Sequence, residues 1–129
     1  MKKIYLMLSA VLISATLWAQ TSDKKAEDLI TFKETTHDFG KIKQGVPVTY
    51  DFIFTSNAAT PVIIETATAS CGCTTPTWPK QPILKGKSDK ITAGFNAAAA
   101  GPFHKSIYVK VANVAAPLEL KISGEVVSQ

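Results

Sequence analysis

Apolar and polar side chains alternate with a period of two along much of the chain. The clearest example is residues 46–54, where every second residue is a large apolar one. Similar alternation returns at 91–95, 103–111 and 118–126, and weaker examples lie at 30–35 and 61–66. Successive side chains of a strand point to opposite faces of its sheet, so this pattern indicates strands with one buried face.

Turn-forming residues separate these segments. They lie at 39–41, 56–59, 85–87, 96–102 and 113–117. No segment has an apolar stripe at helical spacing, and short strands separated by regular turns are typical of antiparallel sandwiches. The sequence therefore predicts an all-β fold, an immunoglobulin-like antiparallel β-sandwich of about seven strands over residues 30–129.

The N-terminus has the layout of a secretory signal. Met1-Lys2-Lys3 is cationic, residues 4–18 are apolar and uncharged, and Ala19 precedes a polar stretch. We expect a cleaved signal peptide over 1–19, followed by a flexible leader over 20–29.

The apolar run is too short for a membrane-spanning helix, which needs roughly 20 residues. No cysteine ends it, as a lipid anchor would require, because the first cysteine is Cys71. The expected mature protein is therefore exported, periplasmic or extracellular, soluble, without a stable membrane span and not a lipoprotein.

Charge argues against a nucleic-acid partner. All 14 basic residues are lysines, and the formal net charge of the 129 residues is only +4. Without arginine the chain lacks the planar fork that reads guanine or clamps phosphate with two hydrogen bonds.

Five segments resemble a known bacterial family. In order and spacing they are similar to the domain of unknown function 1573, over nearly all of the predicted domain: His37-Asp38-Phe39-Gly40-Lys41-Ile42, the Gly45–Phe54 strand, Ser70-Cys71-Gly72-Cys73-Thr74-Thr75, Gly101-Pro102-Phe103-His104-Lys105-Ser106-Ile107 and Leu118–Val127. The resemblance implies an exported sandwich, related in form to the major-sperm-protein and Hydin-type domains that bind other proteins. It implies no chemistry. The sequence departs from the family at Gly86, where Lys85 replaces a frequent proline, and this affects only a turn.

Cys71 and Cys73 are the two cysteines. On an extended chain their Cα atoms would lie about 7 Å apart, so a disulfide between them needs a local bend. We expect Gly72 to permit this bend, because glycine tolerates a positive φ. A bridge that closes so short a loop would stabilise the fold by only about 1.6 kcal/mol and would be easily reduced.

Three interpretations of the cysteine pair stand open. The first is an inert short disulfide, or two partly buried thiols. The second is thiol exchange with a partner, for which Lys80 is the cation that could approach. The third is a soft metal ion, Cu(I) or Zn(II), with His37 and His104 or a second chain as further ligands. Alternation places His104 on the solvent face and His37 before a turn, so both are expected to be solvated.

Residues 74–82 contain three prolines and predict a stiff, extended connection. Trp78 within it either covers one end of the core or offers an aromatic contact on a rigid loop. If loops at one end of the sandwich form a site, Cys71, Cys73, Trp78 and Phe39 belong to it.

No pattern indicates an enzyme. Asp38-Phe39-Gly40 matches the metal-binding triplet of kinases, but the rest of the kinase signature is absent from the sequence. We therefore expect a non-enzymatic interaction module, without a cofactor, that binds another envelope protein, a surface polymer or a further copy of itself. The alternative is a thiol-redox or copper- or zinc-binding protein that uses the Cys-Gly-Cys motif.

Overall fold

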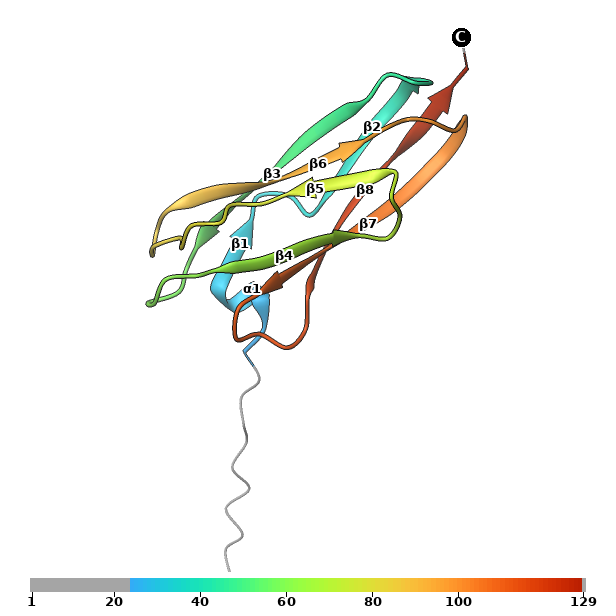
Figure 1. Ribbon diagram of the computed structural model, residues 1–129. Coiled ribbons are helices and arrows are strands. Elements are labelled where there is room, and N and C mark those ends of the chain that lie inside the picture. Colours follow the sequence, from blue (N-terminus) through green and yellow to red (C-terminus); the bar gives the residue numbers. More distant parts are fainter. Residues whose placement is uncertain (1–23, 129) are drawn as a thin grey trace, which may run out of the picture.

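The computed structural model describes residues 24–128, which form two four-stranded sheets packed face to face (Figure 1). The predicted signal peptide and residues 20–23 of the predicted leader lie outside the described residues. In chain order the elements are α1 (Ala26–Leu29), β1 (Ile30–Phe32), β2 (Thr36–Lys43), β3 (Val48–Ser56), β4 (Ile64–Ala69), β5 (Thr74–Thr77), β6 (Ser88–Phe95), β7 (Gly101–Val111) and β8 (Leu118–Val127).

The strands are ordered β1-β3-β6-β5 in one sheet and β2-β8-β7-β4 in the other. The predicted all-β sandwich is confirmed, with eight strands within residues 24–128. One detail differs from the prediction, since β2 and β8 pair in parallel while the other neighbouring strands are antiparallel.

The chain crosses between the sheets on both sides of the sandwich. Residues 33–35 carry it from β1 in one sheet to β2 in the other, and residues 70–73 carry it from β4 to β5. All four of these strands are edge strands, so each side of the sandwich is closed by one continuous stretch of chain. Exposed strand edges favour unwanted pairing, and such crossovers help to protect them.

The core lies between the sheets and follows the predicted alternation. In β3, Phe52 and Phe54 are 1% and 0% exposed, while Ile53 between them is 39% exposed. The facing sheet contributes the alternate apolar residues of β7 and β8, which are Phe103, Ile107, Val109, Val111, Leu118, Leu120 and Ile122.

Some predicted boundaries were wrong. The turn expected at 39–41 lies inside β2, where the register with β8 shifts between Asp38 and Lys41. Gly40 adopts a φ of +68° there and the Asp38 carboxylate accepts a hydrogen bond from its N–H at 2.8 Å. The glycine thus produces a β-bulge instead of a chain reversal.

Residues 74–77, expected only as a connection, form β5 and pair with β6. At the N-terminal side, residues 26–29 of the predicted flexible leader form the single turn α1. Ala26 is 1% exposed and Leu29 packs against the core. The domain therefore includes this turn, because its two apolar side chains gain burial.

Candidate functional site

The Cys71–Cys73 pair lies at the crossover from β4 to β5. The two residues are joined by a disulfide with their Cα atoms 5.4 Å apart, and both are half-buried. Before the crossover, Ser70 N–H donates to the Ser106 carbonyl at 3.0 Å, and after it Asn96 N–H donates to the Cys73 carbonyl at 3.0 Å. The disulfide is thus held between β7 of one sheet and the end of β6 in the other.

The expected reason for a glycine between the cysteines was wrong. Gly72 does not have a positive φ, in contrast to five other glycines of the described chain, which are Gly40, Gly45, Gly86, Gly101 and Gly124. A Cβ built on Gly72 has no atom within 4 Å. Residues other than glycine can therefore occupy position 72 without preventing the bend.

Replacing Gly72 with alanine should leave the fold and the disulfide intact. The added methyl group enters open space, so we expect the free energy of unfolding to change by less than about 0.5 kcal/mol. Chemical denaturation would measure the free energy of unfolding, and the intact mass with and without reductant would show whether the disulfide is formed. A loss above 1.5 kcal/mol, or free thiols in the variant, would show that the bend does require glycine.

Trp78 does not join the cysteines in one site. It follows β5, whose four residues separate it from Cys73 by about 17 Å of extended chain. Its ring is half-buried against the core, and the Lys80 ammonium lies 3.3 Å from the ring centroid. Lys80 is thus held over Trp78, and the proposed single-end cluster of Trp78, Phe39 and the cysteines does not form.

His37 is not solvated as expected. Its ring is half-buried, stacks on Tyr50 of β3 at a centroid distance of 3.6 Å and meets the edge of Phe39 at 4.6 Å. The Tyr50 hydroxyl donates to the Glu34 carboxylate at 2.6 Å, and this hydrogen bond raises the pKa of Tyr50. His37 therefore connects the two sheets through its contact with Tyr50, and Phe39 packs against the core.

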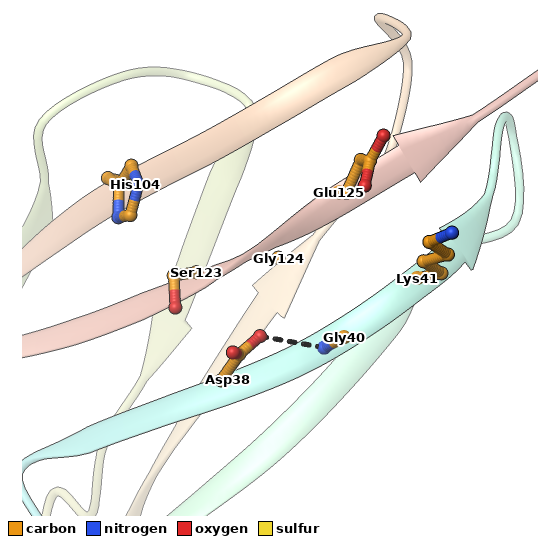
Figure 2. A pocket seen from close by; sticks show the side chains of 7 residues that line it. All are labelled: Asp38, Gly40, Lys41, His104, Ser123, Gly124 and Glu125. Atoms are coloured by element: carbon orange, nitrogen blue, oxygen red, sulfur yellow. Dashed lines mark hydrogen bonds between the residues drawn. The ribbon is translucent and has the colours of Figure 1, made fainter.

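His104 is exposed, as its position opposite Phe103 predicts, and it borders a shallow hollow of about 250 Å³ on the outer face of β2, β8 and β7 (Figure 2). Asp38, Ser123 and His104 occupy one row across the three strands. The serine lies in the middle, whereas a hydrolytic triad needs the histidine between serine and carboxylate. Gly40 and Gly124 line the hollow with their backbone, since a Cβ on Gly124 would instead meet the buried Phe103 ring on the core side.

The metal set considered as the third interpretation, Cys71 and Cys73 with His37 and His104, is not assembled in the part of the chain that the structure describes. Within residues 24–128, no three side chains of His, Cys, Asp or Glu gather as a metal site requires. His37 is engaged with Tyr50 and Phe39, and the two sulfurs are bonded to each other.

Two loops lie at the opposite end of β4 and β5 from the disulfide (Figure 1). Their exposed side chains form an apolar surface. Val62 and Ile83 bridge these loops through reciprocal backbone hydrogen bonds of 2.9 and 2.8 Å, and both side chains are buried. The flanking side chains alternate outwards, and Ile63 and Leu84 are 44% and 55% exposed. We call this surface the end patch; it consists of Pro61, Ile63, Pro82 and Leu84.

A small cavity and a cationic rim border the end patch. The cavity, of about 110 Å³, is lined by Ile63 and Pro61 together with Leu29, and Lys24 lies at its border. Lys85 and Lys87 follow Leu84, are exposed, and form no ion pair within the described residues. The surface therefore combines an apolar centre with positive charge.

The sequence pattern of one protein family matches residues 30–126. The chain belongs to the family "Protein of unknown function (DUF1573)". The resemblance seen in the sequence motifs is thereby confirmed, and the Cys-Gly-Cys element of this DUF1573 domain is the disulfide at the β4–β5 crossover. No curated protein matches the sequence.

Solved structures share the fold of the DUF1573 domain at low sequence identity. A protein of unknown function from Porphyromonas gingivalis has a TM-score of 0.66 at 15% identity, over 76% of this chain and 46% of that one. The ASH/PapD-like domain 7 of human CEP192 has a TM-score of 0.66 at 10% identity, over 82% and 90% of the two chains. The VesB protease of Vibrio cholerae has a TM-score of 0.59 at 13% identity, over 76% and 32%. The chain therefore spans less than half of the first of these proteins and about a third of the protease.

Sequence reasoning missed the end patch, although its signal is present. Val62 and Ile83 each lie between a proline and an apolar residue, in Pro61-Val62-Ile63 and Pro82-Ile83-Leu84. Alternation within such a short segment buries one apolar residue and exposes its neighbours.

Within residues 24–128 no helix is long and apolar enough to cross a membrane.

Proposed function

We propose that the DUF1573 domain is an exported, non-enzymatic interaction module that binds another envelope or surface protein through its end patch. The observation that carries this proposal is the pair Ile63 and Leu84, two large aliphatic side chains at 44% and 55% exposure on loops fixed by the Val62–Ile83 bridge. Contiguous exposed apolar residues surrounded by polar ones are typical of interaction sites.

Rigidity supports a binding role. Pro61 and Pro82 restrict the backbone on each side of the bridge, so that little conformational entropy is lost when a partner orders the loops. The lysines Lys24, Lys85 and Lys87 favour a partner with a carboxylate beside an apolar side chain. The PapD-like likeness supports the fold only, and export rests on the N-terminal sequence.

A paired charge substitution tests the proposal. Ile63→Asp combined with Leu84→Asp should abolish specific co-purification of a partner from the envelope or secreted fraction of the producing cell, because aspartate cannot be desolvated in an apolar interface. Val46→Asp is the matched control, since Val46 is 48% exposed and lies in the β2–β3 turn, outside the patch.

Quantitative mass spectrometry of the captured proteins would compare the two variants with the wild type, and a thermal melt would verify folding. Loss in the double variant with retention in Val46→Asp is the expected result. An unchanged set of captured proteins in a folded double variant would remove the end patch from the proposal.

A further inference from the structure

A cavity and an unpaired lysine adjoin the Cys71–Cys73 disulfide. The cavity holds about 170 Å³ and is lined by Cys73, by Lys105 of β7 and by apolar residues, among them Phe95, Ala99 and Phe103. Cys71 is not part of its lining. One of the two sulfur-bearing residues therefore borders a space that a small molecule or side chain can enter.

Lys105 occupies an unusual position for a cation. It shares the inward-facing side of β7 with Phe103 and Ile107, both of which are buried. The pairing of β4 with β7 ends at Ala69, opposite Ile107, and Ser70 N–H still donates to the Ser106 carbonyl, so that Cys71 leaves the strand beside Lys105. Lys105 has no carboxylate partner among residues 24–128.

From this geometry we infer a thiol-exchange site in which the Cys73 sulfur is attacked by a small anionic thiol held in the cavity, and Lys105 stabilises both the thiol and the released Cys71 thiolate. The inference is independent of the end patch and goes beyond the interaction function. The substrate class is a low-molecular-weight or peptide thiol with a carboxylate close to its sulfur.

The exchange proceeds in two balanced steps. The substrate thiolate forms a bond to Cys73 Sγ, the Cys71–Cys73 bond breaks, and its electron pair leaves on Cys71 Sγ. The Thr74 hydroxyl lies 4.0 Å from both sulfurs and can donate to the new thiolate. A second substrate thiolate then attacks the substrate sulfur of the mixed disulfide, which releases an oxidised thiol dimer and leaves both cysteines reduced.

Three small thiols of different charge test the inference on the purified, oxidised protein. They are 3-mercaptopropionate (anionic), 2-mercaptoethanol (neutral) and cysteamine (cationic), with rates of mixed-disulfide formation compared per thiolate. We expect the adduct on Cys73, with Cys71 free for alkylation, and a rate for 3-mercaptopropionate about threefold or more above that for cysteamine.

Lys105→Gln should remove the preference for the anionic thiol and slow all three reactions. Lys121→Gln is the matched control, because Lys121 pairs with Ser106 on the neighbouring strand and is exposed on the outer face of the same sheet. Peptide mapping locates the adduct. Samples quenched with an alkylating reagent at successive times give the rates of mixed-disulfide formation. An adduct on Cys71, a disulfide that does not react, or equal charge preference in Lys105→Gln and the wild type would each overturn the inference.

Discussion

Replacing Gly124 with alanine is expected to destabilise the domain by about 3 kcal/mol, at the upper end of the usual cost of overpacking. A Cβ at this position would lie 2.8 Å from the Gly40 carbonyl oxygen and 2.9 Å from two ring carbons of Phe103. Neither neighbour can move freely. Gly40 belongs to the bulge of β2, and the Phe103 ring is 6% exposed and stacked on Phe95 at 4.0 Å.

Urea denaturation of Gly124→Ala beside Gly72→Ala would measure this effect. Both variants add one methyl group to a glycine, but only the first meets neighbouring atoms. The difference in the free energy of unfolding between them therefore combines the cost of the clash with that of the φ of +158° at Gly124, which Gly72 does not share. Equal stability of the two would mean that β2 and β8 do not approach at Gly40 and Gly124 as described.

Replacing Phe54 with alanine should cost about 3–5 kcal/mol, the usual range for a buried phenylalanine. Phe54 is 0% exposed, and its ring lies 5.3 Å from that of Phe32 on β1. Its loss would leave a cavity between the central strand of one sheet and the facing sheet. A domain of this size has a total stability of only about 5–15 kcal/mol, so the variant would be marginal.

The neighbour of Phe54 supplies the control. Ile53 is 39% exposed and pairs with Lys90 on the outer face of β3 and β6. Ile53→Ala should therefore cost less than about 1 kcal/mol, the span of strand propensities. Thermal and denaturant unfolding of both variants would compare the two faces of one strand, and equal losses would contradict the alternation of buried and exposed positions.

The alternation was sufficient to predict the fold class. In β3 the predicted inward-facing residues Phe52 and Phe54 are buried, while Val48 and Tyr50 are half-buried. In β7 and β8 every apolar residue predicted to face inward is buried, because a sheet packed on one face fixes the register of its side chains. The parallel β2–β8 pair was not predictable in the same way. It results from a chain crossover at residues 33–35, and local periodicity does not indicate which partner a strand will have.

The candidate sites were less accessible to sequence reasoning because they depend on contacts between distant segments. Lys105 lies 34 positions from Cys71 in the sequence, and only the pairing of β4 with β7 brings them together. Lys80, which is much closer in sequence, is held over Trp78. Gly40 likewise indicated an interruption of the strand, but only the pairing of β2 with β8 decides whether this interruption is a turn or a bulge.

The most direct test of the interaction function is photo-crosslinking in the producing cell. A benzophenone side chain placed at Leu84 should form a covalent product with another envelope or surface protein, because Leu84 is 55% exposed, more than Ile63 beside it in the end patch. The same group at Tyr108, 39% exposed on the outer face of β7, should form no such product. Products of equal yield at both positions, or none at Leu84, would contradict the proposal that the end patch is the binding surface.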